Sequence, residues 1–134
     1  MNLDFLFYPQ SVAVIGASNK EGKIGNAIMK NLINFGFKGK IYPVNVKEEK
    51  ILGIKAYKSV LEIPENVDVA VISIPGKFVP QTLEECGQKG VKGVVVISAG
   101  FKEAGNVELE EKLLEVARKW NIRIVGPNCL GVTN

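Results

Sequence analysis

The chain has 134 residues, of which 46% are hydrophobic and 23% are charged, and its formal net charge is +3. This length fits one domain with a sizeable core, and the composition excludes an intrinsically disordered protein. The positive charge is mild and forms no basic block, which argues against a nucleic-acid partner, and no apolar run is long enough to cross a membrane. The N-terminus lacks the regions of a secretion signal, so we expect a cytoplasmic protein.

Residues that carry catalysis or hold metals are scarce. The chain has no histidine, which excludes imidazole catalysis. Its two cysteines, Cys86 and Cys129, lie far apart and form no CxxC pair, so we expect small buried hydrophobes or a site residue rather than a disulfide. We expect no catalytic residue and no metal site.

A buried strand leads directly into a glycine-rich loop near the N-terminus. Val12 to Ile15 is a short apolar run of the kind that a strand buried on both faces needs. Gly16 and Gly25 bracket the loop, and apolar residues from Ile24 onward repeat at helical spacing. Glycines permit a tight turn and close approach of backbone to a ligand. The free amides and partial positive charge of a helix start attract phosphate.

The loop is not the usual dinucleotide fingerprint GxGxxG, because its glycines stand at positions 16, 22 and 25. The residues between them include Ser18, Asn19 and Lys23. Ordinary turn glycines are the alternative interpretation. The position, length and polar content of the loop favour a phosphate or pyrophosphate site.

A second strand, from Ile41 to Val44, ends in a polar tip. A domain that binds NAD would place an acidic residue about here to hold the ribose hydroxyls. This chain has Asn45 and Lys47 instead. A lysine favours a phosphorylated ribose, as in CoA or NADP, whereas a carboxylate would repel it. A solvated lysine with no ligand role is the alternative.

Three further buried strands are expected at Val67–Ile72, Val94–Ile97 and Ile122–Val125. Between them, residues 79–90 and 109–120 have the apolar spacing of packing helices. Residues 51–60 are predicted to be a connector with a short extended piece at 54–57.

This alternation predicts an α/β fold, a Rossmann-like doubly wound parallel sheet of five main strands with helices on both faces. We expect the strand order 3-2-1-4-5, with the reversal between the first and fourth strands. Residues 16–25 and 98–101 would then flank the ligand crevice, with Asn45 to Lys47 and Ile74 to Gly76 on the adenosine side.

The sequence resembles the N-terminal CoA-binding domain of the α subunit of ADP-forming acyl-CoA synthetases, which are related to succinyl-CoA ligase. The resemblance spans nearly the whole chain. It rests on five segments in order: PQSVAVIGAS at 9–18, YPVN at 42–45, VDVAVI at 67–72, VISAGF at 96–101 and GPNCLG at 126–131.

The resemblance implies that Ser18, Asn19 and the following loop hold CoA phosphates, and that Lys47 or a neighbour serves the adenosine phosphate. It implies that Ile74 and Pro75 line the adenine-side wall, and that Asn128 lies near the active-site end. The candidate CoA-binding residues are Gly16, Ser18, Asn19, Lys23, Ile24, Gly25, Asn45, Lys47, Ile74, Pro75, Ser98, Gly100 and Asn128.

The family interconverts acyl-CoA, ADP and phosphate with free acid, CoA and ATP through a phosphorylated histidine on a later domain. Because this chain has no histidine, we expect residues 1–134 to be one CoA-binding module that is inactive alone, with the remaining domains or subunits as its partners. Two alternatives stay open: a free-standing CoA-binding regulatory or partner-binding protein, and an NADP-dependent oxidoreductase domain. The abundance of Lys, Glu, Ile and Val with few Gln is typical of a thermophile.

Overall fold

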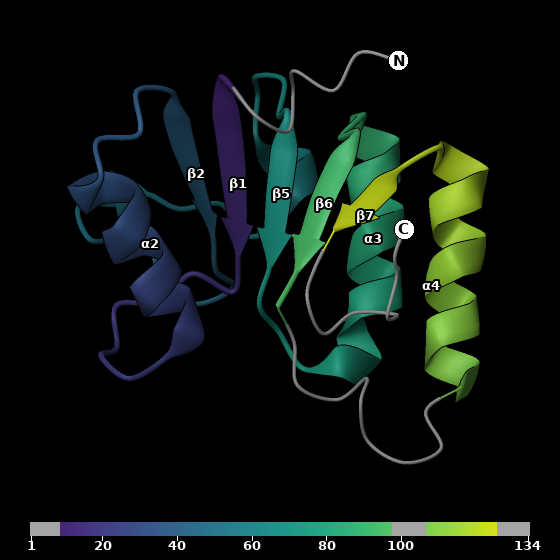
Figure 1. The fold of residues 1–134 in the computed structure, drawn as a ribbon. Coiled ribbons are helices and arrows are strands. Elements are labelled where there is room, and N and C mark those ends of the chain that lie inside the picture. Colours follow the sequence, from purple (N-terminus) through teal and green to yellow (C-terminus); the bar gives the residue numbers. More distant parts are fainter. Residues whose placement is uncertain (1–8, 98–106, 126–134) are drawn as a thin grey trace.

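The structure, a computed structural model, describes residues 9–97 and 107–125. Its centre is a sheet of five parallel strands in the order β2-β1-β5-β6-β7 (Figure 1). The strands are β1 (Ser11–Ile15), β2 (Lys40–Val44), β5 (Val69–Ile72), β6 (Gly93–Val96) and β7 (Arg123–Val125). The predicted doubly wound α/β class with five main strands is confirmed.

The predicted strand order is wrong, because β5 pairs with β1 instead of lying beyond β2. The outer edge of β2 is unsuited to a further long strand. Pro43 lies in β2 and has no N–H to donate, and its carbonyl accepts a bond from Tyr57 on that edge. The chain therefore returns across β1, and the reversal of strand order falls between β1 and β5.

The outer edge of β2 is covered by a small hairpin that the sequence did not reveal. Strands β3 (Lys50–Ile51) and β4 (Ile54–Lys55) pair antiparallel, and Tyr57 continues as an isolated parallel bridge to Val44. Only an extended piece at 54–57 was predicted here. Strands this short carry almost no periodic signal, so turn chemistry alone could have indicated them.

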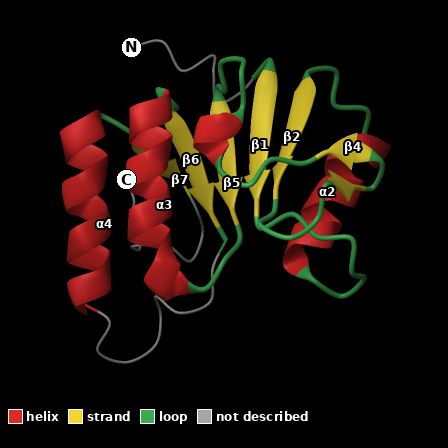
Figure 2. Cartoon of the chain, turned by 180° about the vertical axis from the view of Figure 1, so that it is seen from behind, coloured by secondary structure: helices red, strands yellow, loops and turns green. Residues whose placement is uncertain are grey.

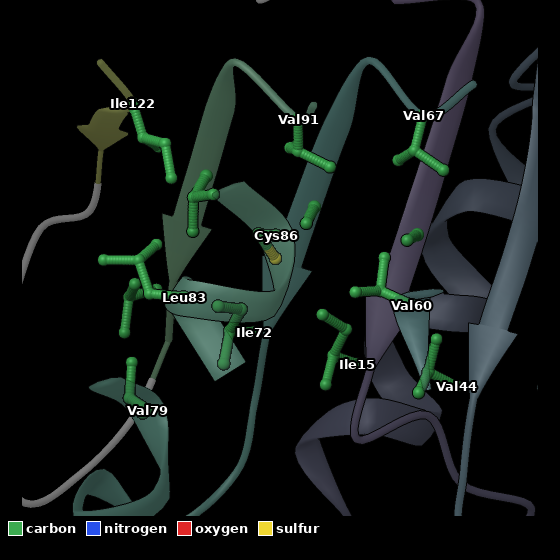
Figure 3. Close-up of a cluster of buried hydrophobic side chains, with 14 of the residues drawn as sticks. Ile15, Val44, Val60, Val67, Ile72, Val79, Leu83, Cys86, Val91 and Ile122 are labelled. Carbon is green, nitrogen blue, oxygen red and sulfur yellow. The ribbon is translucent and has the colours of Figure 1, made fainter. Parts of the chain in front are cut away.

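Helices lie on both faces of the sheet, as predicted (Figure 2). One face packs under α2 (Ile24–Asn34), where Met29 and the hairpin residue Ile51 are fully buried beside β1. The other packs under α3 (Val79–Lys89) and α4 (Val107–Trp120). Figure 3 shows this second cluster, in which Ile72 of the sheet lies beside Leu83 of α3 and Ile15 lies between Ile72 and Val60. No helix in the described ranges is long and apolar enough to cross a membrane.

Candidate functional site

The loops that follow β1, β2 and β5 meet at the carboxyl edge of the sheet, where the arrowheads point in Figure 1. Open α/β sheets bind ligands at this edge, where the strand order reverses. Because the reversal lies between β1 and β5, the loop after β5 borders the β1 loop directly. Residues 98–101, which were predicted to flank the crevice, lie outside the described residues.

Two glycines let these loops pack backbone against backbone. A β-carbon on Gly16 would lie 2.1 Å from the carbonyl oxygen of Ser73, and one on Gly25 would lie 1.9 Å from that of Gly16. Gly16 also has a φ of +95°, which favours glycine. The close approach that these glycines permit is therefore to the protein itself, and it fixes the start of α2 against the end of β1.

The N-terminus of α2 has unpaired amides and no acidic neighbour in its first turn. Lys23 caps the helix without a side-chain hydrogen bond, and its carbonyl accepts bonds from the amides of Asn26 and Ala27. Within the described residues, the amides of Ile24 and Gly25 have no acceptor. Free amides and the helix dipole together make a place for an anionic group.

Three asparagines join the β1 loop to three different parts of the chain. Asn45, after β2, donates to the Ala17 carbonyl at 2.9 Å. Asn26, buried in the first turn of α2, donates to the Ser18 carbonyl at 3.1 Å. Asn19 bonds to the hairpin backbone. These amides fix the shape of the loop.

Asn19 and Asn45 were predicted as ligand contacts. In the structure, the oxygen and the nitrogen of each side-chain amide are hydrogen-bonded to backbone groups. The Asn45 carbonyl oxygen accepts from the amides of Lys47 at 2.7 Å and Glu48 at 2.8 Å. Sequence reasoning missed the role of Asn26. The one sign of this role in the sequence is a polar residue directly after Gly25, at the start of the helix. A polar side chain that is buried there needs a hydrogen-bond partner.

The charged side chains around the loop leave it positive. Lys23 and Lys47 are exposed and form no ion pair with a described acid. The one carboxylate in the loop, Glu21, is paired with Lys30 of α2, and the hydrogen bond from Lys30 lowers the pKa of Glu21. Lys23 therefore offers its charge to an anion without an opposing free carboxylate in the loop, whereas the exposed Glu48 and Glu49 directly follow Lys47.

The remaining predicted residues lie in the β5 loop, in the β1 loop and outside the described ranges. Ile74 is half-buried and packs on the core, and Pro75 is exposed just before a short 3-10 turn at Gly76–Phe78. Ser18 is half-buried, and its hydroxyl accepts from the Lys20 amide at 3.0 Å. The predicted residues Ser98, Gly100 and Asn128 lie outside the described residues.

Cys86 is not part of this edge. It lies on α3 within the core shown in Figure 3, and burial raises the pKa of its thiol to about 12. A thiol with this pKa stays protonated and is a poor nucleophile. Among the described residues no group of side chains could hold a metal ion.

Comparison with known proteins identifies relatives of the whole chain. The chain is 63% identical to the α subunit of an ADP-forming acetate–CoA ligase I of Pyrococcus furiosus, over 98% of this chain and 30% of the relative. It is 60% identical to an ADP-forming acetate–CoA ligase of Methanocaldococcus jannaschii, over 98% of this chain and 18% of the relative. It therefore spans less than a third of the length of either relative.

The fold is shared with a solved structure. The apo form of an acetyl-coenzyme A synthetase 1 from Candidatus Korarchaeum cryptofilum superposes with a TM-score of 0.90 at 48% identity, covering 95% of this chain and 28% of that one. The family described as "CoA binding domain" matches residues 10–134. The chain thus belongs to the CoA-binding domain family, and its relatives are the corresponding parts of ADP-forming acetate–CoA ligases.

Proposed function

We propose that this chain binds coenzyme A at the carboxyl edge of its sheet, with the pyrophosphate at the N-terminus of α2. The observation that carries the proposal is the pair of amides at Ile24 and Gly25 that find no acceptor among the described residues, with no acid in the first turn of the helix. A pyrophosphate offers the negative charge and acceptor oxygens that such a helix start lacks. Membership of the CoA-binding domain family gives the same ligand.

The adenosine end of CoA carries a 3′-phosphate, for which Lys47 is the proposed partner. Its backbone is anchored by Asn45, so the side chain starts from a fixed point beside the β1 loop. Lys23 is the competing candidate, since it caps α2 and is also exposed. Ile74 and Pro75 remain the proposed apolar wall beside the adenine.

The chain is further proposed to serve as the CoA-binding module of an ADP-forming acyl-CoA ligase. It matches only 18% and 30% of the length of its two ligase relatives, so other domains or subunits would supply the phosphate transfer and the acyl site. The chain has no histidine that could carry a phosphoryl group. It would therefore hold CoA while its partners perform the chemistry.

Calorimetric titration of the purified chain with CoA, NADP and NAD tests the proposed ligand. We expect CoA to bind with modest affinity, because the partner domains would close over the pantetheine arm, and we expect NAD and NADP to bind more weakly. NADP binding tenfold tighter than CoA would overturn the assignment in favour of an oxidoreductase domain. An assay with acetate, ATP and CoA should give no acetyl-CoA from the chain alone, and turnover by a preparation free of other synthetases would contradict the module role.

A further inference from the structure

Asn19 joins the β1 loop to the β3–β4 hairpin through both ends of its side-chain amide. The amide nitrogen donates to the Lys50 carbonyl at 2.8 Å, and the amide oxygen accepts from the Leu52 backbone N–H at 2.8 Å. In a parallel sheet, a residue of a neighbouring strand bonds in the same way, to the carbonyl of one residue and to the N–H of the residue two positions later. The Asn19 side chain therefore takes the place of one residue of a third strand on the hairpin.

The hairpin end of this contact is strained. Leu52 has a φ of +50° and Gly53 a φ of +83°, as in a two-residue turn of type I′. Asparagine, aspartate and glycine adopt this conformation readily, whereas a leucine there is unusual. A strained backbone conformation persists where surrounding contacts hold it in place. Here the Leu52 N–H donates to the side-chain oxygen of Asn19.

The hairpin itself is anchored in the core. Ile51 is fully buried and Ile54 packs on the same cluster, beneath α2. The base of the hairpin is closed by the Ala56 amide, which donates to the Glu49 carbonyl at 2.9 Å. A continuous chain of contacts thus runs from the core through the hairpin and Asn19 to the loop before α2.

We propose that Asn19 is a positioning residue for CoA: it holds the β1 loop on the hairpin in the shape that presents its free amides to the pyrophosphate. This inference rests on the proposed function, because it assumes that CoA binds on this loop. It differs from the expectation that Asn19 touches the ligand, since both ends of its amide are already bonded to Lys50 and Leu52.

The Leu52 amide reports directly on the contact, because its only partner among the described residues is the Asn19 oxygen. Contact and ligand are reciprocally coupled: if the intact contact raises CoA affinity by some factor, bound CoA must stabilise the contact by the same factor. Amide hydrogen exchange followed by NMR measures that stability residue by residue. The Ala56 amide, at the base of the same hairpin, is the internal control.

Saturating CoA should slow exchange at Leu52 several-fold and leave Ala56 unchanged. Asn19→Ala should remove the protection of Leu52 and weaken CoA binding by about five- to tenfold, matching the slowing in wild type, with protection at Ala56 retained.

The possible outcomes separate cleanly. Faster exchange at Leu52 with CoA bound would mean that Asn19 leaves the hairpin to touch the ligand, which overturns the positioning role. Unchanged exchange at Leu52, with CoA-induced protection elsewhere in the β1 loop, would make the contact purely structural and would also overturn it. If CoA alters no amide of the chain, the proposed function itself fails and this inference falls with it.

Discussion

Gly25 packs so closely on Gly16 that a β-carbon on Gly25 would lie 1.9 Å from the Gly16 carbonyl oxygen and 2.8 Å from its carbonyl carbon. Both atoms belong to backbone, which cannot swing aside as the end of a side chain can. This contact seats the first turn of α2 against the end of β1. The loop glycines are therefore needed for folding as well as for the shape of the site.

Gly25→Ala should destabilise the chain by about 3 kcal/mol or prevent folding, because the added carbon forces two backbone segments apart. Gly22→Ala is the matched control: apart from its chain neighbours, no atom of the described residues lies within 4 Å of the site of its β-carbon, so only its φ of +92° matters. That left-handed conformation costs about 1 to 2 kcal/mol for a residue with a side chain. Urea unfolding followed by circular dichroism measures both. Equal stability of the two variants would contradict the packing role.

The sequence predicted the elements well where they were long and periodic. The apolar run predicted β1 nearly at its observed bounds. The repeat that places Val79, Leu83 and Cys86 on one helix face did the same for α3. The strand order was not predictable in this way. It depends on whether the third long strand joins the free edge of β1 or the outer edge of β2, and that choice follows from the hairpin and Pro43 on the outer edge of β2.

The location of the candidate site stays a prediction, whereas the contacts of its side chains are visible in the structure. The strand, loop and helix start predict an anion site from residue types alone. The partners of Asn19, Asn26 and Asn45 are backbone atoms on other elements, up to 33 residues away in the case of Asn19 and Leu52. An asparagine in a loop has the same appearance in a sequence whether it bonds a ligand or braces the backbone.

Alkaline pH should destabilise the fold through Cys86. Burial, and secondarily the charge of Glu85, raise the pKa of the Cys86 thiol from an ordinary value of 9.0 to about 12 in the folded chain. Above about pH 9 the unfolded chain loses this proton while the folded chain keeps it, so the free energy of unfolding falls as pH rises. Tyr42, whose pKa is raised from 10.0 to about 12 by burial and by its hydrogen bond to Glu65, adds to the loss above about pH 10.

Cys86 contributes more than Tyr42 to the loss between pH 9 and pH 10, because its ordinary pKa of 9.0 lies below the 10.0 of Tyr42. Urea unfolding of wild type should show stability falling across this interval, and Cys86→Val should flatten the slope. In a Cys129→Ser background, where Cys86 is the one remaining thiol, a thiol reagent should modify the unfolded chain and spare the folded one. Rapid modification of the folded chain would show that the thiol is not buried.

Lys47 should set the preference for CoA over dephospho-CoA. Its side chain is exposed and pairs with no described acid, while its backbone N–H is held by Asn45 at 2.7 Å. An exposed ion pair would contribute about 0.2 to 1 kcal/mol, whereas a charge-assisted hydrogen bond to the 3′-phosphate contributes roughly 1.5 to 3 kcal/mol. The larger range corresponds to a preference of roughly ten- to a hundredfold.

Calorimetry with both ligands checks this assignment, with Lys38→Ala as the control. Lys38 is an exposed lysine just before β2, at the amino end of that strand and away from the candidate site. Lys47→Ala should remove most of the preference and barely change dephospho-CoA affinity, and rising salt should erode the preference of wild type because ions screen an exposed charge. Lys38→Ala should behave as wild type. If Lys47→Ala weakens both ligands equally, or neither, Lys47 does not contact the 3′-phosphate, and the same pair of titrations on Lys23→Ala then tests the β1 loop as its site.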